Sequence, residues 1–233
     1  SSTSRGLGDV YKRQKYGLPY AEPFTLLTYR NGLTLIVLFI LMQANKSIWP
    51  KSGWAFIHLM VTGLLIHGIY LGGVFQAIKW DISIGLTAMI IGLQPLGMAL
   101  IAGVILHERV SRKQWMGLII GLIGLYLILF EKVDFAITGL FTNYSFWAVL
   151  AVFGSLVGIS LGTIYQKRFC NDMDLISGTL VQYFGAFILC IVMSFYFENG
   201  DINWTNTFIV TLGWQVFGPV SYTHLTLPTK RIV

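Results

Sequence analysis

Four residues with polar or helix-breaking side chains lie about midway along long apolar stretches of this sequence: His67, Gln94, Pro95 and Ser155. Imidazole, amide and hydroxyl groups can hydrogen-bond a solute, and a proline leaves the backbone carbonyl one turn before it without its usual donor. Tyr70 follows His67 by three residues, which puts both side chains on one face of an α-helix. Polar groups at similar depth in several apolar helices are typical of a path for a polar solute. The plainer alternative is that they bond or kink neighbouring helices passively.

The same residues offer little for catalysis. Every Asp and Glu lies at or beyond the edge of an apolar stretch, so the sequence contains no carboxylate relay for protons at membrane depth. It has neither a G-x-S-x-G elbow nor an H-E-x-x-H helix, and His67 with Ser155 is the one pair that could act as base and nucleophile of an intramembrane enzyme. The two cysteines, Cys170 and Cys190, are interpreted as packing residues. We therefore expect no catalytic residues, no metal site and no cofactor.

The elements that must position these polar groups are membrane-spanning helices. Of the 233 residues, 55% are hydrophobic and only 11% are charged, and the mean hydropathy is +0.69, whereas about a quarter of a soluble domain is charged. Stretches of about 20 apolar residues match a hydrocarbon core of roughly 30 Å, and they lack the alternation of barrel strands. The expected fold is therefore an all-α membrane protein, a polytopic transmembrane helix bundle. Its apolar stretches, the last too short to span, are residues 25–42, 53–78, 82–106, 114–130, 145–165, 175–197 and 207–218.

The two ends of the chain are interpreted as translated sequencing adapters. DNA that can encode DVYKRQ, residues 9–14, has a reverse complement that encodes VSYTH, residues 220–224. We expect residues 1–14 and 219–233 to be adapter-derived artefacts and the natural protein to continue in both directions. Without these ends most of the formal charge of +6 disappears, so the basic composition does not indicate a nucleic-acid partner.

Lysine and arginine are distributed unequally between alternate loops. Cytoplasmic loops of membrane proteins are enriched in these residues, so the richer set predicts the cytoplasmic side of a multi-pass protein in the inner (cytoplasmic) membrane. Arg30, near the outer end of its apolar stretch, could attract an anion or extend its side chain to the interface, and we favour the second. The richer set of loops carries Lys46, Lys51, Arg109, Arg112, Lys113, Lys167 and Arg168, and the poorer set carries Lys15, Lys79 and Lys132.

Glycines repeat at intervals of four residues in three of the apolar stretches. Small residues at this spacing let transmembrane helices approach closely, so we interpret these glycines as helix-packing residues, although a smooth face would also let helices slide or rock. They are Gly68 and Gly72, then Gly117 and Gly121, then Gly154, Gly158 and Gly162.

A weak internal repeat relates two parts of the chain. An offset of 152 residues places PFTLLTYRNGLTLIVL, residues 23–38, along LISGTLVQYFGAFILC, residues 175–190. Five apolar stretches separate the loops that precede these segments, and an odd number gives the two copies opposite orientations in the membrane. Inverted repeats of this kind are typical of transporters that bind a solute at the membrane midplane.

One long segment resembles a known family. Residues 94–129, QPLGMALIAGVILHERVSRKQWMGLIIGLIGLYLIL, resemble the end of an EamA domain of the drug/metabolite transporter superfamily. The shared pattern is a mid-helix proline, a Glu-Arg pair at the helix end, a polar turn and a glycine-rich final helix. The resemblance implies a partial form of a ten-helix fold with two inverted five-helix repeats. Residues 15–132 would form the first repeat without its first helix, and residues 145–218 the truncated start of the second.

The resemblance and the polar groups together predict a permease that moves a small metabolite or drug-like solute by alternating access. The alternatives are an intramembrane enzyme and a non-transporting membrane scaffold subunit. The expected partners are a small-molecule substrate and the lipid bilayer, with a homodimer left open and no nucleic acid. The predicted substrate path consists of His67, Tyr70, Gln94, Pro95, Trp147, Ser155, Trp214 and Gln215.

Overall fold

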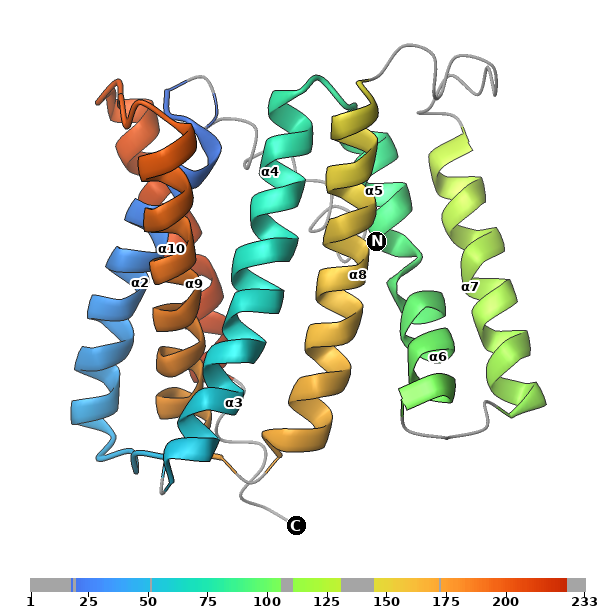
Figure 1. The fold of residues 1–233 in the computed structure, drawn as a ribbon, viewed down its shortest axis with the longest axis horizontal. Helices are drawn as coiled ribbons and strands as arrows, with labels where there is room; N and C mark the ends of the chain where they lie inside the picture. Colours follow the sequence, from blue (N-terminus) through green and yellow to red (C-terminus); the bar gives the residue numbers. More distant parts are fainter. Residues whose placement is uncertain are drawn as a thin grey trace. The chain divides into compact units, whose positions relative to one another are not determined.

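The structure is a computed structural model that describes residues 18, 20–50, 52–105, 111–130, 145–171 and 173–225. Within these residues every regular element is a helix (Figure 1). The helices are α2 (Pro23–Ala44), α3 (Gly53–Gly63), the π-helix η1 (Leu64–Tyr70), α4 (Leu71–Lys79), α5 (Ile84–Gly92), α6 (Gln94–Ile105), α7 (Arg112–Phe130), α8 (Phe146–Phe169), α9 (Leu175–Phe197) and α10 (Asn206–Leu225). The expected all-α fold class is confirmed.

Five of these helical stretches are long and apolar enough to cross a membrane: Pro23–Ala44, Gly53–Lys79, Ile84–Ala102, Phe146–Phe169 and Leu175–Phe197. Each coincides with a stretch expected from the sequence, because an apolar run of this length is stable as a helix in lipid. Helix α10 continues beyond the expected end at residue 218 to Leu225. The predicted segment 1–14 and the cations Lys15, Lys51, Arg109 and Lys132 lie outside the described residues.

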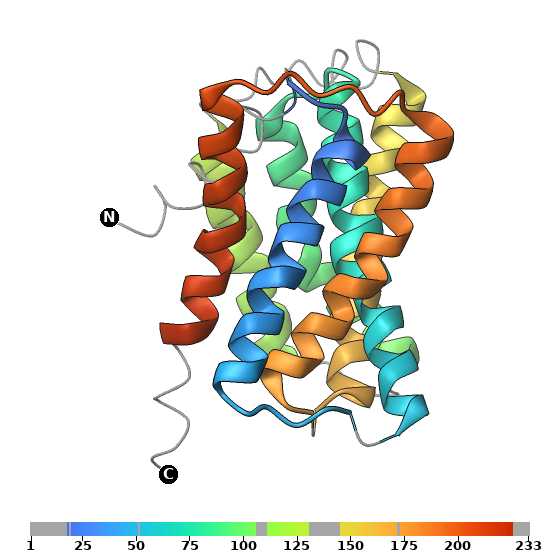
Figure 2. The ribbon, with the colours of Figure 1, turned by 90° about the vertical axis from the view of Figure 1, so that its left-hand side faces the viewer.

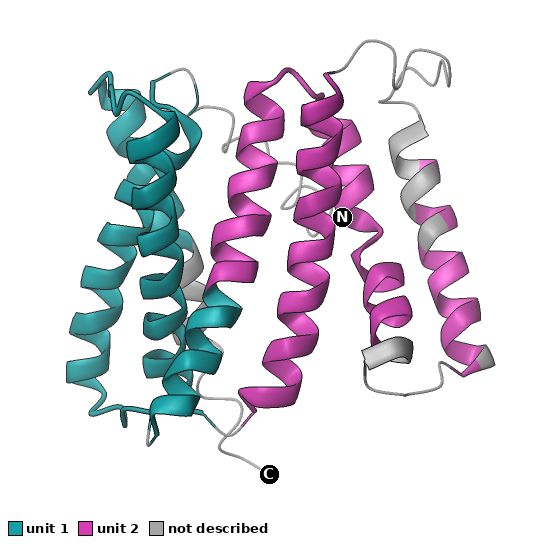
Figure 3. Cartoon of the chain, in the orientation of Figure 1, with its two compact units in different colours: residues 1–63, 172–233 teal, residues 64–171 magenta. Residues whose placement is uncertain are grey.

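The chain divides into two units, residues 1–63 with 172–233 and residues 64–171 (Figure 3). Unit 1 contains α2, α3, α9 and α10. Unit 2 contains η1 and helices α4 to α8. The boundary falls between α3 and η1, inside one long helical stretch, so no loop separates the two units at this point.

In unit 1, α2 packs antiparallel to α9, while α3 packs against α9 and α10 packs against α2. Figure 2 shows α2 between α10 and α9. Toward the end of α2 and the start of α9, a cluster of buried apolar residues joins the two helices: Leu38, Met42, Ile176, Leu180 and Tyr183. Asp174 caps α9, because its carboxylate accepts from the backbone N–H groups of Ile176 and Ser177 at 3.1 and 3.0 Å.

In unit 2, α8 is the central helix and contacts η1, α4, α5 and α6. Close approach is possible where one partner is glycine. A Cβ added at Gly158 would lie 3.0 Å from Ile69 Cγ2, and one added at Gly162 would lie 2.6 Å from Ile66 Cγ1. These two glycines of α8 therefore seat the π-helix η1.

Candidate functional site

The predicted interruption at Gln94 and Pro95 is present. Helix α5 ends at Gly92 and α6 begins at Gln94, with Leu93 between them. The Leu93 N–H turns back to the Ile90 carbonyl at 3.1 Å, which is a tighter bond than an α-helix makes, and Pro95 has no N–H to give. The break places Gln94 at the first position of α6.

Gln94 reaches α8 across this break. Its Nε2 donates to Thr163 Oγ1 at 3.5 Å, and the Thr163 hydroxyl in turn donates to the Ile159 carbonyl at 2.7 Å. Interhelical hydrogen bonds of this kind hold polar groups at membrane depth. The Gln94 carbonyl oxygen is not used by this bond and stays available as an acceptor.

Ser160, one turn before Thr163 on α8, is fully buried and its Oγ has no hydrogen-bond partner among the described residues. The backbone of α6 approaches it at Gly97, where an added Cβ would lie 2.8 Å from Ser160 Oγ. A buried hydroxyl without a partner costs about 1–3 kcal/mol, so such a group usually meets a water or a ligand. We call Gln94, Gly97, Ser160 and Thr163 the α6–α8 polar niche.

His67 and Tyr70 both lie in η1, a seven-residue π-helix inside an otherwise α-helical stretch. π-turns are rare and are frequent at functional sites. The expectation that the two side chains share one face assumed α-helical periodicity. A π-turn takes more residues, so a spacing of three no longer completes the turn and the two side chains diverge more than expected.

Ser155 is packed between α8 and α4 in unit 2. It is fully buried, its Oγ donates to the Ala151 carbonyl at 2.7 Å, and a Cβ at Gly73 of α4 would collide with that Oγ. Its hydroxyl is thus held by its own helix and packed on α4. Because this proton is already donated to a carbonyl, the structure does not support Ser155 as a nucleophile activated by His67.

The remaining predicted path residues lie elsewhere. Pro95 is exposed at the start of α6, and Trp147 on α8 has 62% of its surface exposed. Trp214 on α10 has 57% exposed, whereas neighbouring Gln215 is half-buried and neither of its side-chain atoms, Nε2 and Oε1, has a partner among the described residues. Trp214 and Gln215 belong to unit 1 and the other predicted path residues to unit 2.

The glycines differ in what they contact. Gly68 and Gly72 are buried, and Gly158 and Gly162 seat η1. No described atom lies within 4 Å of a Cβ added at Gly117, Gly121 or Gly154, so no close helix contact is seen there. The two tightest contacts, at Gly63 and Gly73, involve glycines that sequence reasoning did not single out, as do further close contacts at Gly97 and Gly185.

Arg30 corrects an expectation. A side chain that extends to the interface should be exposed, but Arg30 is buried with only 8% of its surface exposed. The preference for an interfacial position is therefore wrong for this residue.

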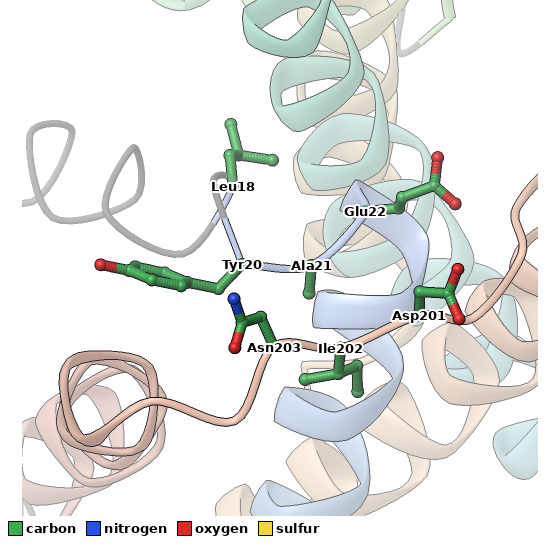
Figure 4. Close-up of a pocket in the computed structure, with 7 residues that line it drawn as sticks. All are labelled: Leu18, Tyr20, Ala21, Glu22, Asp201, Ile202 and Asn203. Carbon is green, nitrogen blue, oxygen red and sulfur yellow. The ribbon is translucent and has the colours of Figure 1, made fainter.

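A surface cavity of about 420 Å³ lies at the start of α2 in unit 1. It forms because residues 20–22 run beside residues 201–203: Ala21 and Ile202 make an antiparallel bridge, and the Asn203 N–H donates to the Tyr20 carbonyl at 2.8 Å. Figure 4 shows Glu22 and Asp201 together on one side of this cavity. None of the predicted path residues lines it. In the described part of the chain, no three His, Cys, Asp or Glu side chains gather as metal ligands would.

Long apolar helices with a few polar groups between them define a polytopic helical membrane protein. The model of the EamA-like transporter family matches residues 10–130, which is more than half of the chain. The chain therefore belongs to the EamA-like transporter family.

Curated relatives agree with this assignment. The chain is 27% identical over 217 residues to the uncharacterized transporter YvbV of Bacillus subtilis, covering 87% of this chain and 67% of the relative. It is 26% identical over 203 residues to YyaM of the same organism, covering 81% and 61%, and 27% identical over 178 residues to sll0355 of Synechocystis, covering 69% and 52%. Both are also named uncharacterized transporters. The chain thus spans between about half and two thirds of the length of these relatives.

Proposed function

We propose that this protein is a carrier that moves a small metabolite or drug-like solute across the cytoplasmic membrane by alternating access. The observation that carries the proposal is the α6–α8 polar niche. An unpartnered Ser160 hydroxyl lies next to a helix break, and close to it Gln94 extends to Thr163. Passive helix packing has no use for a buried hydroxyl without a partner, whereas a solute that visits the niche supplies one.

The π-helix η1 supports the second part of the proposal, which is movement. Alternating access needs helices that shift while staying packed. η1 meets α8 through Gly158 and Gly162, which have no side chains to hinder movement of one helix along the other, and a π-turn differs from an α-turn only in its hydrogen-bond spacing. His67 lies within this segment and would change its position with it.

The orientation in the membrane follows from charge. The loop after α2 with Lys46 and the end of α8 with Lys167 and Arg168 are assigned to the cytoplasmic side, and the turn after α4 with Lys79 to the outer side. The relatives' names support transport rather than catalysis, and the bonded state of Ser155 argues against a hydrolase.

Substrate counterflow in vesicles tests this proposal. The purified chain is reconstituted with an internal pool of labelled amino acids, organic acids and nucleosides, and exchange is measured against protein-free vesicles. We expect exchange of at least one solute, lowered several-fold by Ser160→Ala and by Thr163→Ala.

A matched control is Thr179→Ala on α9, whose hydroxyl also donates to the carbonyl four residues before it, at 2.7 Å, but accepts no bond from Gln94. Equal loss with Thr163→Ala and Thr179→Ala would remove the niche from the path. Product formation without exchange would instead favour an enzyme, and stable capture of a partner subunit without exchange would favour a scaffold.

A further inference from the structure

Buried polar atoms without a hydrogen-bond partner are concentrated in unit 1. Among the described residues there are five: Arg30 Nε, Asn31 Oδ1, Ser160 Oγ, and Nε2 and Oε1 of Gln215. All but Ser160 Oγ lie on α2 and α10, which pack against each other. Arg30 Nε is the most costly of these atoms to leave unpaired, because it belongs to a charged group at membrane depth.

Arg30 is the eighth residue of α2, roughly 10 Å from the start of the helix. Only 8% of its surface is exposed, and its Nε has no hydrogen-bond partner among the described residues. The neighbouring Asn31 is fully buried, and its Nδ2 donates to Cys190 Sγ at 3.6 Å. Its Oδ1 has no hydrogen-bond partner among the described residues.

A carboxylate at the end of α9 does not neutralise Arg30. Glu198 binds the start of α2 through both of its carboxylate oxygens. Its Oε1 accepts from the Phe24 N–H at 2.9 Å, and its Oε2 accepts from the Thr25 N–H at 2.7 Å and from Thr25 Oγ1 at 2.8 Å. The positive end of the helix dipole and three donors hold this charge one turn or more before Arg30. None of these hydrogen bonds of Glu198 goes to Arg30.

The internal repeat places Gln215 opposite Arg30. Helices α2 and α9 begin at Pro23 and Leu175, 152 residues apart, and α3 and α10 begin at Gly53 and Asn206, 153 residues apart, so the sequence offset of 152 fits both pairs to within one residue. It makes Gln182 the counterpart of Arg30 and Gly63 the counterpart of Gln215. Gly63 of α3 abuts the backbone carbonyl of Gln182 on α9, so the corresponding contact brings Gln215 of α10 to Arg30 of α2.

We infer that Arg30, Asn31 and Gln215 form a binding site for the carboxylate of a small organic anion. The guanidinium pairs with the carboxylate, the Gln215 amide donates a second hydrogen bond, and Asn31 Oδ1 accepts from a hydroxyl or ammonium of the same molecule. This inference rests on the proposed carrier function for its meaning, since it assigns the class of solute, but binding can be measured without transport.

The test uses the purified chain in detergent, with benzoate as the anion and benzamide as its neutral analogue. Thermal unfolding followed against ligand concentration gives the affinity. We expect benzoate, and not benzamide, to raise the unfolding temperature, and Arg30→Gln to weaken benzoate binding about tenfold or more. Arg168→Gln, which removes an exposed arginine from the end of α8, should leave binding unchanged.

Two further variants keep the result interpretable. Gln215→Leu removes two unpartnered buried atoms, so it should unfold at the same or a higher temperature and still bind benzoate several-fold more weakly. Arg30→Lys keeps the charge and should retain part of the affinity even if Arg30→Gln does not fold. Absence of any benzoate effect on the unmodified chain, or equal affinity in all variants, overturns the site.

Failure of the site and failure of the carrier are distinguishable. Benzoate binding that depends on Arg30, without counterflow of any solute, leaves the anion site standing and removes the carrier. Counterflow of neutral solutes that is unchanged in Arg30→Gln, together with no effect of benzoate on unfolding, leaves the carrier standing and removes the anion site.

Discussion

Unit 1 has two halves, α2 with α3 and α9 with α10, and the two repeat the same construction in opposite directions. Thr25 lies in the first turn of α2, and its hydroxyl donates to Glu198, just after the end of α9, at 2.8 Å. Its counterpart Ser177 lies in the first turn of α9, and its hydroxyl donates to the Ile48 carbonyl, just after the end of α2, at 2.7 Å. Each helix start is thus tied to the chain that leaves its partner, which is what an inverted repeat predicts.

The halves differ in how the next helix closes on this pair. Helix α3 meets α9 backbone to backbone: Gly63 abuts the Gln182 carbonyl, and a Cβ at Gly185 would lie 2.8 Å from the Met60 carbonyl. Helix α10 packs on α2, and in this pair Arg30, Asn31 and Gln215 carry buried polar atoms without partners among the described residues. One half is closed by glycine and serves as a scaffold, and the other keeps polar atoms open for a ligand.

The largest effect is expected at the closed half. Gly63→Val pushes a branched side chain into the backbone carbonyl of Gln182, which cannot move without displacing α9. We expect a loss of about 3 kcal/mol or more in stability, because overpacking against rigid backbone is not relieved by rotamer changes. Thermal unfolding in detergent measures it.

The control for this prediction is Gly213→Val on α10, where no described atom lies within 4 Å of an added Cβ. It should cost no more than the small loss of helix propensity of a β-branched residue. Equal losses at the two positions would mean that the halves are packed alike, and the comparison would fail.

A smaller effect separates the two hydroxyl contacts. Thr25→Val removes a hydrogen bond to the Glu198 carboxylate and one with Ser194 Oγ, and should cost about 1.5–3 kcal/mol. Ser177→Ala removes a single bond to a neutral carbonyl and should cost about 0.5–1.5 kcal/mol. Chemical denaturation of both variants gives the two values. A larger cost for Ser177→Ala would reverse the order that charge predicts.

Much of the fold was predictable because its elements are set by local composition. The stretch 175–197 was expected with the bounds that the structure has, and Pro95 marked the break between α5 and α6. Apolar length, proline and charged loops act on the residues next to them, so a single sequence suffices to read them.

The site was less predictable because it depends on contacts between distant segments. Nothing in LLIHGIY distinguishes a π-helix from an α-helix, and the contacts of η1 with Gly158 and Gly162 join segments that are distant in the sequence. Ser160 resembles Ser155 in sequence, yet only Ser155 finds a carbonyl to bond. The burial of Arg30 likewise follows from its neighbours in space and not from its position near a helix end.

The accessibility of position 94 tests the proposed carrier most directly. Gln94→Cys is made in a Cys170→Ala, Cys190→Ala background and treated with a membrane-impermeant maleimide in right-side-out and in inside-out vesicles. Lys46→Cys in the same background serves as the reference, and should react only in inside-out vesicles. Alternating access predicts that position 94 reacts from both sides, and that a transported solute slows both reactions. Reaction from one side only, or from neither, would contradict it.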